Sequence, residues 1–504
     1  MIRRVKVENG WVRGLPAADP RITSYKGIPF AAPPVGENRW RAPQPCADWE
    51  GDWLAYDFAP ASMQAAPVIE DSNVYTREWS IDPELPMDED CLYLNVWAPA
   101  DGRSGLPVFV WYFGGGLQVG HTAEMEFDGE RIARRGVVVV TVNYRLNAFG
   151  FLCHPEITAE APDAPANFGF LDQQFATRWV KRNIAAFGGD PENITIGGQS
   201  AGGMSVSAQI ACKANEGLFK GAIIQSGMFA PAYPSFFGLN VTLAEAEEKG
   251  RRFFEESLGV KTLAEARQVD AKTLLRKALQ WPGMWCAAAD GVFMPRSSND
   301  WYLEKNRVVC PVMMGSTDSE FMLYPNAKDE EGLRAFAEAT YGPEAERFLS
   351  LFRHPATAET IHEDGEISAI DFAIHAAARA TRGEGMPIYA YQFAMDIPGW
   401  DNAGTFHSVD LWFFFETLAK CWRPFTGRHY DLARRMCDYW VNFIRTGDPN
   451  GVDSIGELLP RWPVYDPDKP ARMRFAEPME AAQVPASPLR DFLTEQLERN
   501  REGK

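Results

Sequence analysis

The most informative stretch of the sequence is Ile194-Thr195-Ile196-Gly197-Gly198-Gln199-Ser200-Ala201-Gly202. Its β-branched residues favour a strand up to Ile196, and the small residues after Ser200 open a helix. A serine at the tip of such a strand-to-helix turn has a strained backbone, and glycines on both sides remove side chains that would clash there. The N-terminus of the new helix points its free N–H groups at the place where an oxyanion would form. This context predicts that Ser200 is a nucleophile rather than a helix cap.

The rest of the chain alternates buried strands with amphipathic helices. The predicted strands cover residues 107–113, 137–142, 194–196, 222–224, 308–314 and 388–393. The predicted helices cover residues 168–187, 245–258, 328–352 and 430–445. This order predicts an α/β fold, in which a mostly parallel, twisted central sheet has helices on both faces and long insertions. No linker and no repeat interrupts the pattern, so we expect a single domain over residues 1–504.

Composition excludes several functional classes. The chain is 46% hydrophobic and 12% aromatic, which is enough for a large core, and its net charge of −18 disfavours a nucleic-acid partner. No apolar stretch is long enough to cross a bilayer, and the N-terminus does not look like a secretory signal. The eight cysteines have neither CxxC pairs nor regular spacing. We therefore expect reduced thiols, no metal site and a cytoplasmic location.

A nucleophilic serine needs a histidine base on a later loop. The histidines beyond Ser200 are His354, His362, His375, His407 and His429. His375 is predicted to lie inside a helix, and the others except His407 lie in charged segments typical of surface or helix ends. His407 follows the strand at 388–393 and a polar loop, and it precedes the apolar run at 411–415. This position favours His407 as the base.

The orienting acid is expected after another strand of the sheet. The strand at 308–314 leads into a loop that contains both Asp318 and Glu320, and the pattern does not choose between them. The oxyanion hole is expected to use the backbone N–H of Ala201 and donors from the glycine run at 114–116, which directly follows an early strand.

The chain resembles the type-B carboxylesterases, a family of α/β-hydrolases that includes cholinesterases and bacterial para-nitrobenzyl esterases. Residues 187–202 fit the family's nucleophile signature, and residues 89–97 fit its second signature. Other family-like stretches lie at residues 26–31, 143–145, 167–173, 225–227 and 440–443. The resemblance runs from near residue 20 to about residue 466.

Carried over by position, the resemblance implies a role for each candidate. It favours Glu320, five residues after Gly315, as the acid, with Asp318 as the runner-up, and it supports His407 as the base. It also implies that the serine of the Gln-Ser-Gly segment supports the acid by hydrogen bonding. The implied oxyanion donors and supporting serine are Gly115, Gly116, Ala201 and Ser226.

Three positions depart from the family pattern. Phe113 stands where a His or Tyr usually precedes the glycine run, and Phe321 stands where a Gly commonly follows the acid. Cys91 occupies a family disulfide position, but Ser62 stands at its partner position. The missing bridge favours an intracellular protein.

Together these residues predict a serine carboxylic-ester hydrolase that forms an acyl-enzyme on small or medium acyl or aryl esters, without metal or cofactor. An amidase or thioesterase remains an alternative on the same residues, and a non-catalytic interaction module is a weaker one. The expected partner is a small-molecule ester, and the protein is expected to be a monomer or a homo-oligomer. Candidate pocket residues, which core packing would explain equally well, are Phe113, Leu117, Met228, Phe229, Trp412 and Phe413.

Overall fold

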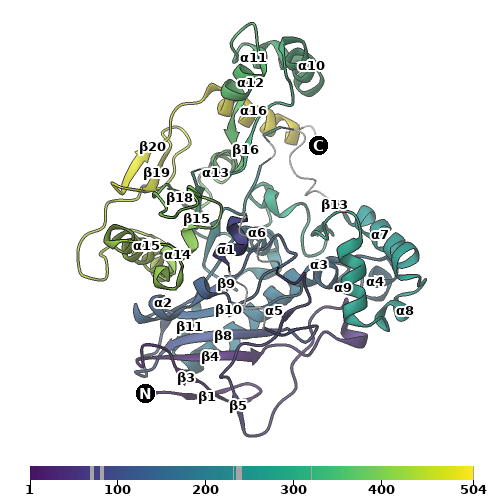
Figure 1. Ribbon diagram of the computed structural model, residues 1–504, viewed down its shortest axis with the longest axis vertical. Helices are drawn as coiled ribbons and strands as arrows, with labels where there is room; N and C mark the ends of the chain where they lie inside the picture. The colour runs from purple at the N-terminus through teal and green to yellow at the C-terminus, as the bar shows by residue number, and fades with distance from the viewer. Residues whose placement is uncertain (68–72, 80–84, 231, 234–240, 319, 503–504) are drawn as a thin grey trace.

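An 11-stranded sheet forms the centre of the protein, as a computed structural model shows (Figure 1). The structure describes residues 1–67, 73–79, 85–230, 232–233, 241–318 and 320–502. In sheet order the strands are β20 (Glu480–Gln483), β19 (Ala471–Phe475), β18 (Ile388–Phe393), β15 (Val312–Thr317), β12 (Gly221–Gln225), β11 (Gly189–Gln199), β9 (Leu106–Tyr112), β10 (Val138–Val142), β8 (Tyr93–Pro99), β4 (Ile22–Pro29) and β3 (Leu15–Pro16). The shorter strands are β1 (Arg4–Val7), β2 (Gly10–Arg13), β5 (Asp52–Leu54), β6 (Ala61–Ser62), β7 (Met87–Asp88), β13 (Val241–Thr242), β14 (Ala288–Ala289), β16 (Met322–Leu323) and β17 (Ile367–Ser368).

The middle of the sheet is parallel, and its two ends are antiparallel. Every pairing from β10 through β9, β11, β12, β15 and β18 to β19 is parallel, whereas β8, β4, β3 and β20 pair antiparallel. The carboxyl ends of the parallel strands therefore meet at one edge of the sheet. In open α/β sheets this edge is where ligands bind.

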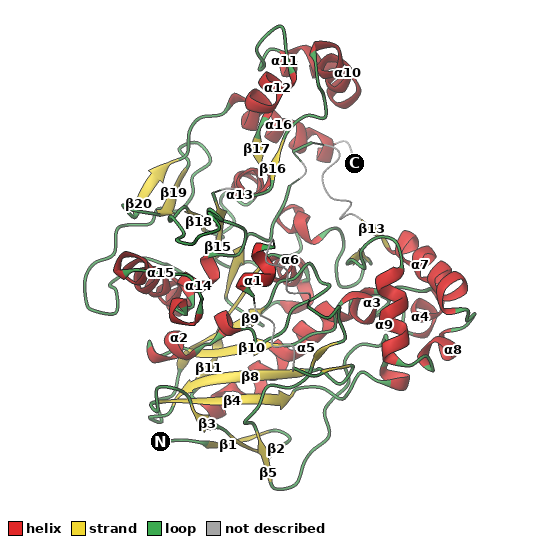
Figure 2. Ribbon diagram, in the orientation of Figure 1, coloured by secondary structure: helices red, strands yellow, loops and turns green. Residues whose placement is uncertain are grey.

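Helices cover both faces of this sheet (Figure 2). They are α1 (Val74–Glu78), α2 (Glu130–Arg134), α3 (Asn147–Phe151), α4 (Pro155–Glu160), α5 (Phe168–Asn183), α6 (Ala201–Ala211), α7 (Leu243–Arg252), α8 (Leu263–Arg267), α9 (Ala271–Gln280), α10 (Glu330–Tyr341), α11 (Ala345–Leu349), α12 (Ala358–Gly365), α13 (Ala369–Ala380), α14 (Asp410–Phe414), α15 (Gly427–Thr446) and α16 (Pro488–Glu502). Short 3₁₀ helices are η1 (Gly36–Asn38), η2 (Met125–Phe127), η3 (Ile184–Phe187), η4 (Lys213–Asn215), η6 (Ser298–Leu303), η7 (Gly342–Glu344) and η8 (Leu418–Lys420), and η5 (Phe253–Leu258) is a π-helix.

Alternate residues of the central strands point into two separate cores. On β9, Val108 and Val110 join the core beneath α5 and α6, while Phe109 and Trp111 join the core beneath α14 and α15. This alternation is what a sheet buried on both faces requires. The predicted α/β architecture is therefore confirmed.

The bounds of several predicted elements differ in the structure, and two of the differences have a clear local cause. The strand predicted at 308–314 begins only at Val312, because Pro311 has no N–H for the ladder. The helix predicted at 328–352 is broken into α10 and α11, because Gly342 and Pro343 end the first helix. In Figure 1, α10, α11 and α12 gather with α16 at one end of the molecule, and α7, α8 and α9 lie together beside the sheet.

Of the two positions expected for His429, the surface or a helix end, the structure has the helix end. His429 lies in the first turn of α15 and is buried. Its Nδ1 accepts a hydrogen bond from the N–H of Thr426 at 3.0 Å, which caps the helix. Its Nε2 donates to the carbonyl of Asp396 at 3.0 Å. His354 and His362 are exposed and His375 lies inside α13, as predicted. In the described part of the chain, no helix has the length and apolar character needed to span a membrane.

Candidate active site

The turn between β11 and α6 holds Ser200 in an unusual backbone conformation. Its φ is +55° and its ψ is −124°, a combination that non-glycine residues rarely adopt. Its N–H donates to the carbonyl of Gln225 on β12 at 2.8 Å, which fixes the turn against the neighbouring strand. A Cβ on Gly202 would lie 2.0 Å from the carbonyl oxygen of Tyr112, so only glycine lets β9 pass this close. The strained strand-to-helix turn predicted from the sequence is present.

The glycine run after β9 passes beside this turn. Gly115 has φ +109°, and a Cβ on it would lie 2.0 Å from the carbonyl oxygen of Val119. Among the described residues, no acceptor is bonded to the N–H of Gly115 or Gly116. Ala201 begins α6, where the first N–H groups have no partner within the helix. The loop and the helix start therefore bring backbone donors to the neighbourhood of Ser200.

Glu320 and His407 come together from the loops that follow β15 and β18. The carboxylate of Glu320 is buried, and its Oε2 accepts a hydrogen bond from Nδ1 of His407. Its Oε1 accepts from the N–H of Thr317 at 2.8 Å and from the hydroxyl of Ser226. Three donors thus hold one carboxylate in a fixed orientation toward the imidazole.

Asp318, the other candidate acid, points elsewhere on the same loop. Its Oδ1 accepts a hydrogen bond from the hydroxyl of Thr405, and its N–H donates to the carbonyl of Phe393. The carboxylate that the structure brings to His407 is that of Glu320.

The other nitrogen of His407 faces Gln199. The Gln199 amide lies 3.2 Å from Nε2 of His407, and as a donor it requires a lone pair on Nε2 and the proton on Nδ1. Phe321 has φ +52° and packs edge-on against the imidazole, with ring centroids 4.9 Å apart. The side chain that departs from the family pattern therefore contacts the candidate base directly.

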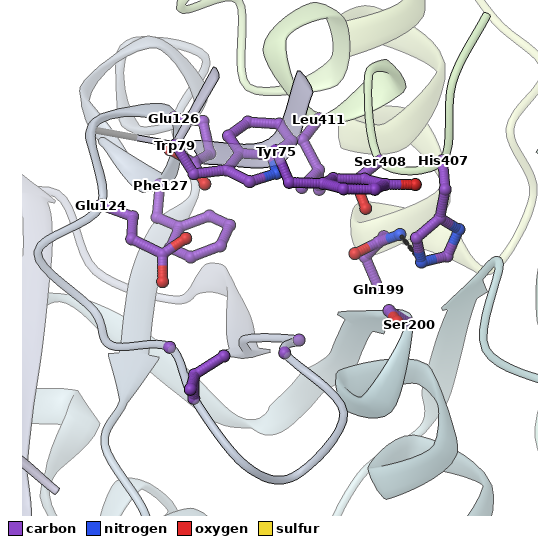
Figure 3. A pocket seen from close by; sticks show the side chains of 14 residues that line it. Tyr75, Trp79, Glu124, Glu126, Phe127, Gln199, Ser200, His407, Ser408 and Leu411 are labelled. Carbon is purple, nitrogen blue, oxygen red and sulfur yellow. Dashed lines mark hydrogen bonds between the residues drawn. The ribbon is translucent and has the colours of Figure 1, made fainter. Parts of the chain in front are cut away.

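Ser200 and His407 line one cavity of about 250 Å³ at the carboxyl edge of the sheet (Figure 3). In Figure 3 they lie on one side of the cavity, and Glu124 and Phe127 lie on the opposite side. The residues that line it are Tyr75, Trp79, Gly114, Gly115, Val119, Gly120, Glu124, Glu126, Phe127, Gln199, Ser200, His407, Ser408 and Leu411.

The chain is similar in sequence and in structure to known carboxylesterases. The sequence model of the carboxylesterase family matches residues 2–347 and 358–492. The chain belongs to the carboxylesterase family. It is accordingly an enzyme that hydrolyses carboxylic esters, and its fold is the α/β-hydrolase fold.

Named relatives span most of the chain. A para-nitrobenzyl esterase of Bacillus subtilis (strain 168) is 31% identical over 486 residues, which cover 92% of each chain. An acetylcholinesterase of Bungarus fasciatus is 30% identical over 93% of this chain and 82% of its own length. A solved para-nitrobenzyl esterase structure superposes with a TM-score of 0.77 at 30% identity, covering 98% of this chain and all of that one.

The six pocket residues expected from the sequence lie outside the described lining of this cavity. All six are buried. Trp412 stacks on Trp79 at 5.6 Å, and Phe229 packs against Phe321 at 4.7 Å, so these two lie one layer behind the site. The others pack within the cores: Phe113 against Tyr144, Leu117 in the core that contains Phe113, Met228 against the indole N–H of Trp301, and Phe413 against Phe393.

The sequence analysis missed several residues that line the cavity. Tyr75 lies in α1 and Trp79 directly follows it; a five-residue helix has too little periodicity to detect. Glu124, Glu126 and Phe127 follow the glycine run, in the segment between the predicted strands at 107–113 and 137–142. The one feature of the sequence that could have indicated these three residues is their position shortly after the glycine run at 114–116.

Ser62 and Cys91 lie together, as their family positions imply. The Ser62 hydroxyl accepts a hydrogen bond from the N–H of Leu146 at 3.2 Å and interacts with the buried thiol of Cys91. All eight cysteines are unpaired thiols, and burial raises the pKa of Cys91 strongly.

Asp410 is a second buried carboxyl group behind the site. Its Oδ2 accepts hydrogen bonds from the hydroxyl of Tyr391 at 2.8 Å and from the amide of Gln225 at 3.2 Å. Burial, and then the charge of Glu320, raise the pKa of Asp410 from 3.8 to about 6. The folded enzyme therefore binds a proton here at pH values where the unfolded chain has lost it.

Replacing Asp410 by Asn should remove the pH dependence of stability that proton binding at Asp410 causes. Because the folded-state pKa is raised, the stability that protonated Asp410 contributes is complete below pH 4 and is lost as the pH rises through about 6. The free energy of unfolding of the wild type, relative to Asp410→Asn, should fall by about 3 kcal/mol across that window. Urea unfolding of both proteins from pH 4 to 7.5 measures the difference. A difference independent of pH would contradict the assignment.

Proposed function

We propose that this enzyme hydrolyses small or medium acyl or aryl esters through an acyl-enzyme on Ser200, with His407 as the base and Glu320 as the group that orients it. The observation that carries the proposal is the hydrogen bond between Glu320 and Nδ1 of His407, beside the cavity that Ser200 lines. This contact leaves the lone pair on Nε2, which is the nitrogen that must accept the serine proton.

Acylation begins when the hydroxyl of Ser200 replaces the Gln199 amide as the donor to Nε2 of His407. The serine oxygen bonds to the ester carbonyl carbon while its proton moves to Nε2. The resulting oxyanion accepts hydrogen bonds from the N–H groups of Gly115, Gly116 and Ala201. The bond to the leaving oxygen then breaks, and the alcohol takes the proton from Nε2.

Deacylation repeats these steps with water. A water molecule gives a proton to Nε2 of His407 as its oxygen attacks the acyl carbon, the bond to Ser200 breaks, and the proton returns to the serine oxygen. Throughout, Glu320 orients His407 and stabilises the imidazolium, and Ser226 keeps Oε1 of Glu320 in place. The balance is one ester and one water converted to one acid and one alcohol.

The cavity supports the proposed substrate size. Its volume of about 250 Å³ lies just below the ~300–1,000 Å³ typical of small-molecule sites. Phe229 and Trp412, one layer behind the site, would shape it indirectly. We also propose that residues 1–504 form one domain, since one sheet joins β3 near the N-terminus to β20 near the C-terminus. The cytoplasmic location and the oligomeric state stay predictions.

Matched substrates test the reaction class. We expect hydrolysis of para-nitrophenyl acetate and butyrate at rates at least about 10³-fold above those of para-nitroacetanilide, because expulsion of an anilide needs far more assistance than that of an ester. Comparable turnover of the anilide would favour the amidase, and preference for an acyl thioester would favour the thioesterase. No turnover of any of them by folded protein would refute the proposal.

A further inference from the structure

Tyr75 lines the catalytic cavity, but the reaction described above does not use it. Ser200 and His407 line the same cavity, and in Figure 3 the phenol of Tyr75 extends across it with the hydroxyl toward His407. The ring packs edge-on against Phe406, the residue before His407, with centroids 6.2 Å apart. The hydroxyl of Tyr75 is therefore held on the His407 side of the cavity.

Specific contacts fix the short helix that carries Tyr75. Asn73 caps α1, because its side chain accepts a hydrogen bond from the N–H of Tyr75 at 2.9 Å. At the other end of α1, Glu78 pairs with Arg423, and both of these side chains are fully buried. A side chain on a fixed element loses little freedom when it binds a ligand, so Tyr75 is suited to contact a reacting atom.

The hydroxyl of Tyr75 has no hydrogen-bond partner among the described residues. The polar atoms of the base and the acid are already engaged: Nδ1 of His407 donates to Oε2 of Glu320, and Nε2 faces the amide of Gln199. The other oxygen of Glu320 has two donors of its own. Burial, and then the charge of Glu320, raise the pKa of Tyr75 above its usual value, so the phenol keeps its proton near neutral pH. It is thus a donor available to a ligand.

The two oxygens of an ester have different surroundings in the proposed mechanism. The carbonyl oxygen accepts hydrogen bonds from the N–H groups of Gly115, Gly116 and Ala201. The alcohol oxygen takes its proton from Nε2 of His407, so it must lie beside that nitrogen. Because the phenol of Tyr75 points to the same side of the cavity, the alcohol oxygen is the one that its hydroxyl can reach.

We propose that the hydroxyl of Tyr75 donates a hydrogen bond to the alcohol oxygen of the bound ester and so assists its departure. The inference rests on the proposed function and adds a catalytic residue to it. As the bond from the acyl carbon to this oxygen breaks, the electron pair stays on the oxygen, which takes its proton from Nε2 of His407. Tyr75 keeps its own proton and stabilises the negative charge that develops before that transfer is complete. The gain is largest for strongly basic alcohols, because their oxygen carries the most charge.

Two acetate esters of similar shape test this directly. Ethyl acetate releases a strongly basic alcohol, and 2,2,2-trifluoroethyl acetate releases a much less basic one. Tyr75→Phe should lower kcat/KM for ethyl acetate by about 10- to 100-fold, as expected for a lost hydrogen bond to a charged group, and for the trifluoroethyl ester by less than about 3-fold. This constant reports the steps up to release of the alcohol, and acid release in a pH-stat measures it for both esters.

The ratio of the two constants is the readout, because a general loss of activity cancels in it. The trifluoroethyl-to-ethyl ratio should rise by about 10-fold in Tyr75→Phe. Tyr430→Phe is the matched control, since Tyr430 lies on α15, is 42% exposed as Tyr75 is, and should keep the wild-type ratio. Tyr75→Leu also removes the ring, so it should show the raised ratio at lower rates. If Tyr75→Phe does not fold, Tyr75→Leu decides the outcome.

Three results would overturn the inference. Wild-type rates for both esters in Tyr75→Phe would show that the hydroxyl contacts no reacting atom, and equal losses for both would show that Tyr75 only shapes the cavity. A wild type that hydrolyses para-nitrophenyl acetate but not ethyl acetate would lack the assistance altogether. The proposed function is tested separately: if the wild type hydrolyses none of the three esters, the proposed reaction itself fails.

Discussion

Replacing Ser200 by alanine should lower kcat for para-nitrophenyl acetate by about 10⁶-fold and leave the fold intact. The variant has no oxygen to form the acyl-enzyme, and removing a nucleophile costs about as much as removing the whole set of residues that act with it. The contact described for Ser200 that fixes the turn is made by its backbone N–H, which alanine keeps. Initial rates measure the loss, and thermal unfolding checks the fold.

Covalent labelling gives the same experiment a second readout. An organophosphate should modify the wild type at Ser200, as mass spectrometry of proteolytic peptides would show, and should not modify Ser200→Ala. Ser207→Ala is the matched control, because Ser207 lies on α6 and its buried hydroxyl has no partner among the described residues. The control should hydrolyse the ester and take the label as the wild type does. Labelling of the Ser200→Ala variant at another serine would refute the assignment.

The central sheet and the turn that carries Ser200 could be predicted because local sequence dictates them. A β-branched run such as residues 137–142 favours a strand in any context, and Gly202 is required by the close passage of β9. The proximity of His407 to the sheet edge followed from its order after a predicted strand. Choosing Glu320 over Asp318 required the family resemblance, because both lie on one loop and only the folded chain shows which carboxylate turns toward the imidazole.

The cavity wall could not be predicted, because tertiary contacts create it. Buried ion pairs hold α1, and with it Tyr75 and Trp79, against distant loops: Arg423 bridges Glu78 and Asp401. Glu78 and Arg423 are 345 residues apart in sequence, so no local pattern reveals their contact. Conversely, an aromatic residue beside a strand fits a core and a pocket equally well, which is why Phe413 was expected at the site and lies in the core.

Glu320→Gln should lower kcat by about 10²- to 10⁴-fold, whereas Asp318→Asn should change it by less than about 5-fold. In the Gln variant, Thr317 and Ser226 still donate to one side of the group, so its carbonyl oxygen stays there and its amide N–H₂ faces His407. That amide donates to Nδ1, which forces the imidazole proton onto Nε2. His407 then has no lone pair toward Ser200, and no anion stabilises the imidazolium.

Asp318→Asn is the matched control for charge, because it removes one carboxylate from the same loop and keeps an oxygen that accepts from Thr405. Rates with para-nitrophenyl acetate from pH 6 to 9 should show the large loss in Glu320→Gln at every pH, since the wrong tautomer is fixed by a group that does not titrate. A larger loss in Asp318→Asn would reverse the assignment. Equal, small losses in both variants would mean that neither carboxylate orients the base, because only Glu320 accepts a hydrogen bond from Nδ1 of His407.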